Sequence, residues 1–293
     1  MEIGFVILNY NTYTETVECI ESIEEKLDTD DYRIVIVDNA SRDDSADRLD
    51  EFIKSKEKAD LIRTEKNLGF ARGNNVGISY VNETYRPKFI VVLNSDTELI
   101  QDDLVYKLDR EFTSSNFALL GPLVLNADGR CDNSPHFAPT KESVTKELET
   151  FQKERNIIKY GLYRPYCGVR FLKRMIEQKV LRKQTPVHRN KEFHQYQRQV
   201  VLQGCFLVFS QKAFECIGGF DEGTFLYYEE PLLYLHLVHC GLTTVYNPEI
   251  CIYHKDGRAS NTVQKKSKDK LLFINQCYQD SAKVLLRSLK LFE

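Results

Sequence analysis

Two aspartates lie at the ends of apolar runs of the chain. Carboxylates in such positions could bind a ligand or take part in catalysis. Asp38 ends the run YRIVIVD, and Asp96 follows the run KFIVVLNS, which contains Asn94. Continuous apolar runs of this kind are typical of strands that are buried on both faces of a parallel sheet. The carboxyl ends of such strands lie at one edge of the sheet, where ligands bind. The spacing therefore predicts a nucleotide-sized site that contains all three residues.

The elements that must position these residues alternate regularly over the first 100 residues. The apolar runs predict strands at 3–10, 32–41, 61–67 and 88–99, and the helical spacings predict helices at 14–27, 44–54 and after the glycine-rich loop that opens 67–81. Thr14 is the expected N-cap of the first helix. Alternation of this kind predicts an α/β protein with a doubly wound parallel sheet. No GxGxxG follows the first strand, which argues against an NAD-dependent oxidoreductase.

The second half of the chain has a less regular pattern. Strands are expected at 118–129, 199–210 and 242–254, and helices at 210–220, 225–241 and 267–292, the last of them amphipathic. Gly218-Gly219 and Gly241 are the expected ends of the first two of these helices, and Pro231 lies near the first turn of the second.

The composition and the charge of the chain limit the classes of protein to which it can belong. The 293 residues include 40 basic and 43 acidic side chains and are 42% hydrophobic, as in ordinary globular proteins. No apolar run reaches the roughly 18 residues that would span a bilayer, and the N-terminus lacks a basic signal-peptide region. We therefore expect a cytoplasmic protein. The eight cysteines form no CxxC pair, so we expect reduced, packed thiols.

The charges are distributed unevenly along the chain. Residues 1–60 contain 17 acidic against 7 basic side chains, whereas residues 152–198 contain 13 basic against 3 acidic ones. The second segment interleaves its bases with aromatic and aliphatic residues, a pattern that favours peripheral contact with an anionic membrane. A solvated helical hairpin that covers a substrate-binding site or forms a dimer is the alternative. Nucleic acid is not expected, because no RNA- or DNA-binding module is present.

Seven segments, taken in order, resemble a family 2 glycosyltransferase of the GT-A fold, in the rhamnosyltransferase-like branch of bacterial surface-polysaccharide synthesis. They are VILNYNT, VDNASRD, NLGFARGNNVGI, LNSDTEL, GGFDE, FLYYEE and IYHKDG. The resemblance implies a mostly parallel central sheet flanked by helices. It also implies a nucleotide-sugar-binding half at 1–130, a basic helical insert at 131–198, an acceptor-binding and catalytic half at 199–262, and a C-terminal amphipathic helix at 263–293.

The resemblance implies a divalent metal, Mn²⁺ or Mg²⁺, that stabilises the charge growing on the leaving diphosphate. Asp96 matches the last position of the Asp-x-Asp signature of the family, while Asn94 and Ser95 occupy the first two. His254, after the last strand, matches a histidine that completes the metal or pyrophosphate site. Capping of the following helix is the alternative role of Asp96.

The resemblance also assigns the nucleotide. Asp38 matches the acid that accepts a hydrogen bond from the N3–H of a pyrimidine, with turn formation as its alternative role. The loop Asn9, Tyr10 and Asn11 would flank the base. Other residues resemble the loop near the ribose and diphosphate, with Arg72 as a phosphate partner: Gly69, Arg72, Gly73 and Asn74.

For the chemical step, Glu230 in the pair Glu229-Glu230 matches the general base that deprotonates the acceptor hydroxyl. Acidic residues are also favoured at a helix N-terminus by the helix dipole alone. Asp221 in GGFDE would contact the acceptor. Two departures from the family stand out: glutamate replaces the usual aspartate, and Leu232 occupies a position that is usually acidic. A side chain longer by about 1.5 Å matters for attack geometry.

Two functions follow from the sequence. The first is an inverting glycosyltransferase that moves a sugar, either rhamnose or a hexose or N-acetylhexosamine, from a UDP- or dTDP-sugar to a lipid-linked glycan acceptor. The second is a degenerate relative that binds sugar nucleotide or a partner enzyme without turnover. His236 and His239 have helical spacing but no acidic partner that the sequence can place, so we expect them to serve packing.

Overall fold

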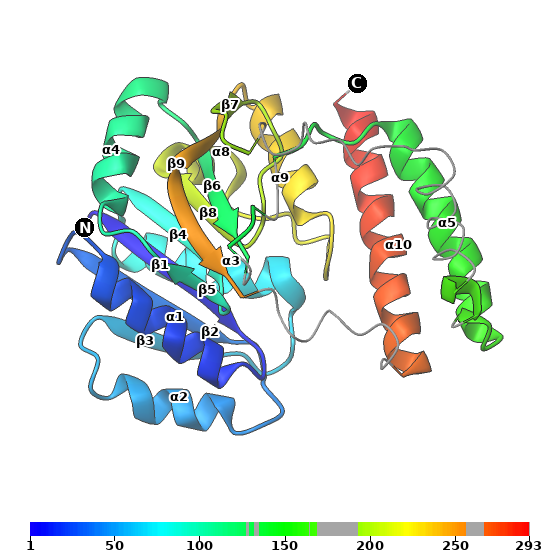
Figure 1. Ribbon diagram of the computed structural model, residues 1–293, viewed down its shortest axis with the longest axis horizontal. Helices are drawn as coiled ribbons and strands as arrows, with labels where there is room; N and C mark the ends of the chain where they lie inside the picture. Colours follow the sequence, from blue (N-terminus) through cyan, green and yellow to red (C-terminus); the bar gives the residue numbers. More distant parts are fainter. Residues whose placement is uncertain (127–128, 132–134, 164, 169–192, 256–266, 293) are drawn as a thin grey trace.

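One mixed sheet of nine strands organises the described part of this computed structural model, residues 1–126, 129–131, 135–163, 165–168, 193–255 and 267–292 (Figure 1). The strand order is β3-β2-β1-β4-β8-β6-β9-β5, and β7 pairs with β9. The strands are β1 (Ile3–Asn9), β2 (Tyr32–Asp38), β3 (Ala59–Arg63), β4 (Phe89–Asn94), β5 (Thr97–Leu99), β6 (Leu119–Leu125), β7 (Gln197–Arg198), β8 (Phe206–Ser210) and β9 (Thr244–His254).

The predicted parallel arrangement of the first four strands is confirmed. β1 pairs in parallel with β2 and with β4, in a register that sets Asn9 opposite Asp38 and Leu8 opposite Asn94. The polar residues that follow these strands therefore meet at one edge, as their sequence positions predict. β8 then runs antiparallel to β4, so the second half of the chain extends the sheet with mixed directions.

Helices cover both faces of the sheet (Figure 1). They are α1 (Tyr13–Lys26), α2 (Ser45–Ile53), α3 (Gly69–Thr84), α4 (Leu104–Ser115), α5 (Lys141–Lys159), α8 (Gln211–Ile217), α9 (Glu229–His239) and α10 (Lys268–Leu291). Buried side chains of α1, α2 and α4 form one apolar cluster with the sheet, whereas those of α3, α8 and α9 form a second. The sheet is thus buried on both sides, which explains the unbroken apolar runs of its strands.

The helices α5 and α10 lie side by side as a pair at the edge of the molecule (Figure 1). Phe151 of α5 stacks on Tyr278 of α10, with ring centroids 4.7 Å apart. Val144, Ala282 and Leu285 form a small core with Leu232 of α9, so the apolar stripe of α10 is buried against the rest of the chain. None of the helices in the described ranges is long and apolar enough to cross a membrane.

The segment expected to bind membrane falls mostly outside the described residues, since 169–192 contain most of its bases. The described part of the 131–198 insert contains α5, which packs on α10. The C-terminal helix predicted for 267–292 is also confirmed.

Several element boundaries differ from the sequence-based expectation. The strand expected at 199–210 begins only at Phe206, and the strand expected at 88–99 divides into β4 and β5. The first helix takes Thr12, not Thr14, as its N-cap residue. The helix expected at 225–241 begins only at Glu229, because Tyr227 and Tyr228 adopt positive φ angles of 76° and 66°. A left-handed backbone at two successive tyrosines cannot continue a right-handed helix.

The expectation of reduced cysteines is wrong for two of the eight. Cys216 at the end of α8 and Cys240 after α9 form a disulfide, with Cα atoms 6.7 Å apart. Both residues are exposed, and the chain folds back between the two helices so that distant positions meet. Sequence spacing of 24 residues gives no sign of such a pair. Cys19, Cys205 and Cys277 are buried and form no disulfide, as expected of core thiols.

Candidate active site

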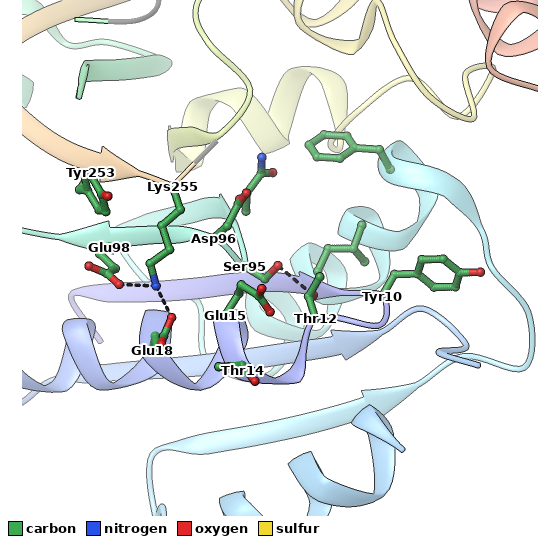
Figure 2. Close-up of a pocket in the computed structure, with 13 residues that line it drawn as sticks. Tyr10, Thr12, Thr14, Glu15, Glu18, Ser95, Asp96, Glu98, Tyr253 and Lys255 are labelled. Carbon is green, nitrogen blue, oxygen red and sulfur yellow. Dashed lines mark hydrogen bonds and ion pairs between the residues drawn. The ribbon is translucent and has the colours of Figure 1, made fainter. Parts of the chain in front are cut away.

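A cavity of about 900 Å³ opens at the sheet edge where the strand ends meet (Figure 2). Residues from the end of β1, the first turns of α1, the β4–β5 junction and the end of β9 line it: Leu8, Tyr10, Thr12, Thr14, Glu15, Glu18, Phe70, Asn94, Ser95, Asp96, Glu98, Tyr253 and Lys255. Its size suits a ligand as large as a nucleotide. Among the predicted nucleotide-binding residues, Tyr10, Asn94 and Ser95 lie here, together with Asp96.

Asn9 and Asp38 form a buried network beside this cavity. The Asn9 amide Nδ2 donates to Asp38 Oδ2 at 2.7 Å, and the Ser41 hydroxyl donates to the same oxygen at 2.6 Å. The backbone N–H of Asn11 donates to Ser41 Oγ, which fixes the loop after β1. Asp38 is 2% exposed, and neither Asn9 nor Asp38 lines the cavity. Asn9 and Asp38 therefore hold the loop that borders the cavity, and do not line the cavity themselves.

Asp96 and His254 meet across two strands. β5 pairs antiparallel with β9 so that Thr97 stands opposite His254, which brings Asp96 Oδ1 within 3.1 Å of His254 Nε2. Adjacent ligand atoms in an octahedral site, each 2.0–2.1 Å from the ion, lie about 3.0 Å apart. The pair therefore fits two positions of a divalent metal site. The described ranges contain no group of three or more His, Cys, Asp or Glu side chains that could hold a metal, so the remaining ligands would come from substrate or solvent.

The cavity wall is acidic, and its lysine is held by two carboxylates. Lys255 Nζ lies 2.5 Å from Glu98 Oε1 and also pairs with Glu18 (Figure 2). Burial alone would lower the pKa of Lys255, but hydrogen bonds to Glu18 and Glu98 raise it, so the ammonium stays charged. A diphosphate entering this wall meets more carboxylates than cations, which favours binding together with a divalent metal. Lys255 was not among the residues predicted from the sequence.

A second cavity of about 300 Å³ adjoins the first and shares Phe70 and Asn94 with it. Its lining also includes both predicted catalytic carboxylates, the predicted metal histidine and a residue from α10: Gln203, Gly204, Cys205, Leu226, Tyr227, Tyr228, Glu229, Glu230, His254 and Tyr278. The structure thus brings together residues from both halves of the chain. A small pocket with two carboxylates beside a nucleotide-sized cavity is suited to transfer of a group from one to the other.

The two glutamates have different surroundings. Glu229 is 5% exposed, and its Oε1 has no hydrogen-bond partner among the described residues. Burial, and then the negative charge of Glu230, raise the pKa of Glu229 to about 7. Burial also raises the pKa of Glu230, whose carboxylate packs so closely on Gly204 that a Cβ there would lie 2.4 Å from Oε1. Carboxylates with raised pKa in a cleft are candidates for proton transfer.

Three residues predicted near the nucleotide lie elsewhere. The Arg72 side chain is exposed and its Nε donates to the backbone oxygen of Glu222 at 3.0 Å, away from both cavities. Gly69, at a φ of +82°, faces the backbone of Phe225, not a ligand, since a Cβ would lie 2.4 Å from Phe225 O. Asn74 is buried and donates to Phe70 O. The loop that contains Gly69 and Arg72 therefore contacts the second half of the chain at Phe225 and Glu222.

His236 packs on the ring of Phe292, as expected, but it also has an acidic partner that the sequence could not place. His236 Nε2 lies 3.6 Å from Asp221 Oδ2, and Asp221 Oδ1 accepts a hydrogen bond from the N–H of Gly223. Burial lowers the pKa of His236, and the charge of Asp221 partly offsets this. Neither residue lines the two cavities, so the structure places Asp221 outside the pocket where an acceptor would meet the carboxylate pair.

The mixed sheet flanked by helices, with a nucleotide-sized cavity at its edge, is the GT-A fold of glycosyltransferases. Solved structures agree on the fold: GalNAc-T7 with UDP, GalNAc and Mn²⁺ gives a TM-score of 0.59 at 14% identity, covering 99% of this chain and 48% of that one. Residues 5–129 match the model of glycosyl transferase family 2. Residues 5–129 of the chain therefore form a glycosyl transferase family 2 domain.

Two curated relatives are similar over most of the chain. The low-salt glycan biosynthesis hexosyltransferase Agl10 of Haloferax volcanii is 25% identical over 229 residues, which cover 78% of this chain and 59% of Agl10. The dTDP-rhamnosyl transferase RfbF of Shigella flexneri is 24% identical over 249 residues, which cover 85% of this chain and 68% of RfbF. The chain therefore spans less than two thirds of the length of Agl10.

Proposed function

We propose that this transferase moves a sugar from a UDP- or dTDP-sugar to a glycan acceptor, with inversion at the anomeric carbon, in bacterial polysaccharide synthesis. One observation carries the proposal: the two cavities adjoin, with Asp96 lining the larger one and Glu229-Glu230 the smaller one. His254 lines the smaller cavity but contacts Asp96. The anomeric carbon of a bound donor would lie near this shared boundary, between a leaving diphosphate and an attacking hydroxyl.

The donor would occupy the larger cavity. Asp96 and His254 would hold Mn²⁺ or Mg²⁺, which supplies charge neutralisation for the departing diphosphate. Tyr10 and the loop held by Asp38 would face the base of the nucleotide. Asn94 and Ser95 would face the end of the donor that carries the diphosphate and the sugar. The names of RfbF and Agl10 support a rhamnosyl or another hexosyl donor, and the Mn²⁺ and UDP of GalNAc-T7 support the metal and the nucleotide.

The acceptor would enter the smaller cavity. There Glu230 accepts the proton of the attacking hydroxyl, and buried Glu229 beside it raises the proton affinity of the pair. A lipid-linked glycan at the cytoplasmic face of the membrane remains the acceptor that the resemblance suggests. Leu232, a departure from the family, is fully buried against α10 and points to a packing role and not to a lost catalytic acid.

The pH dependence of turnover is expected to reveal the buried carboxylate. The pKa of Glu229 is raised to about 7 from its ordinary 4.5, so below pH 7 Glu229 takes up a proton. Its negative charge beside Glu230 is then lost, which makes Glu230 a weaker base. Turnover at saturating donor should therefore rise with pH through about 7 and level off above it. Release of nucleoside diphosphate measured from pH 5 to 9 checks this, and a limb centred near pH 4.5 would contradict it.

Binding of nucleotide separates the donor classes. Thermal unfolding is measured with UDP, dTDP and GDP, each with and without Mn²⁺. A ligand at 100 times its dissociation constant stabilises a protein by about 2.7 kcal/mol, which raises the midpoint by several degrees. We expect a Mn²⁺-dependent rise with UDP or dTDP and none with GDP. Absence of a rise with every nucleotide would favour the alternative, a degenerate relative that binds a partner enzyme without turnover.

A further inference from the structure

The two residues directly before the carboxylate pair adopt an unusual backbone. Tyr227 and Tyr228 have φ angles of 76° and 66°, in the left-handed region that bulky side chains rarely adopt. Such a conformation persists only where surrounding contacts impose it, and it clusters at functional sites. Because Tyr228 is the N-cap of α9, this backbone sets the direction in which Glu229 and Glu230 leave the helix start.

The contacts that impose it come from α5 and α10. The Tyr227 ring stacks on Tyr278 of α10, with centroids 3.7 Å apart and planes 7° from parallel. The Ser281 hydroxyl, one turn further along α10, donates to the backbone oxygen of Leu226 at 2.8 Å. The Tyr228 hydroxyl donates to Glu147 of α5. Each residue of the segment 226–228 is therefore held by the helix pair.

Tyr278 has contacts on both sides. One side of its ring faces Tyr227, Phe151 of α5 stacks on it at 4.7 Å, and Tyr278 itself lines the small cavity with Glu229 and Glu230. The ring thus closes a wall of that cavity and keeps solvent from Glu229. Both helices lie outside residues 5–129, which match the family model, so nothing in that match assigns them a part in the reaction.

We propose that the α5–α10 pair positions the catalytic carboxylates, with Tyr278 as the positioning residue that holds Tyr227 and closes the acceptor pocket. The proposal rests on the proposed function and deepens it. Without the ring, residues 227 and 228 return to an ordinary backbone, the helix start rotates and water reaches Glu229. The titratable groups that interact with the charge of Glu229 are Glu230 on α9, Tyr227 before it and Cys277 on α10.

Donor hydrolysis, in which water replaces the acceptor, tests the proposal on the full chain. Nucleotide release is measured from UDP-glucose, UDP-N-acetylglucosamine and dTDP-rhamnose for Tyr278→Ala, Tyr278→Phe and the control Tyr106→Ala, which removes an exposed tyrosine of α4. For Tyr278→Ala we expect kcat to fall about 100-fold, as misplacement by about 1 Å implies. The dissociation constant of UDP or dTDP should change less than about two-fold, and the acidic limb of kcat should move below pH 7. Tyr278→Phe, which keeps the ring, should restore most of the rate.

A Tyr278→Ala protein with the kcat and pH limb of the unaltered chain would overturn the proposal. Should this variant unfold early, Glu147→Ala removes the exposed partner of Tyr228 and leaves the core intact. We expect it to lower kcat with an unchanged midpoint of unfolding, and an unchanged kcat would equally overturn the proposal. Failure of the unaltered chain to turn over any donor despite binding nucleotide contradicts the proposed function instead, and the positioning role with it.

Discussion

Replacement of Glu230 by glutamine is expected to lower turnover by about 10²- to 10⁴-fold, the usual contribution of a general base. The amide has nearly the same shape as the carboxylate and accepts no proton, so the acceptor hydroxyl keeps its proton as it attacks. The donor cavity does not include Glu230, so the dissociation constant of the nucleotide should stay within about two-fold. Nucleotide release and thermal unfolding with UDP and dTDP measure the two quantities.

Glu215→Gln provides the matched control for this variant. Glu215 is exposed on α8 and lines neither cavity, so the same chemical change there should leave turnover intact. If the Glu230→Gln variant kept nearly full activity, Glu230 would not be the general base. If Glu229→Gln then abolished turnover, Glu229 would be the residue that accepts the proton of the acceptor hydroxyl.

Asp96→Asn is expected to remove the effect of the metal. The amide is a weaker ligand than the carboxylate and carries no charge, so an ion held by Asp96 and His254 would lose one of these two protein ligands. We expect turnover to fall by about 10²- to 10³-fold, the range for loss of one group that stabilises developing charge. The Mn²⁺-dependent part of the thermal shift with nucleotide should disappear.

The control for Asp96→Asn is Asp102→Asn, an exposed aspartate that lines neither cavity. It should keep both the turnover and the metal-dependent shift. A full Mn²⁺-dependent shift in Asp96→Asn would show that the metal binds elsewhere, and the contact between Asp96 and His254 would then be a structural ion pair.

The sequence predicts the elements of the sheet well because burial on both faces leaves a clear pattern. The runs that became β1, β2 and β4 are apolar throughout, and the polar residues after them converge because parallel strands end at one edge. Asp96 and His254 were both predicted, and their contact follows from the antiparallel pairing of β5 with β9.

Other features depend on contacts that no local pattern encodes. The aromatic run before Glu229 looks helical in sequence, but stacking of Tyr227 on Tyr278 of α10 imposes a different backbone. Lys255 became part of the donor cavity through Glu18, 237 positions earlier in the chain. Arg72 carries a charge that suits a phosphate, yet the long-range contact with Glu222 directs it away.

The order of strands in the sheet has a consequence for how the chain is made. β5 and β6 belong to the first 130 residues, but within the described ranges they pair with β8 and β9, which lie at residues 206–254. A nascent chain that has emerged only as far as β6 therefore exposes unpaired strand edges, which invite association with other chains. We infer that the sheet closes late in synthesis, and that the two cavities form only after β8 and β9 have been made.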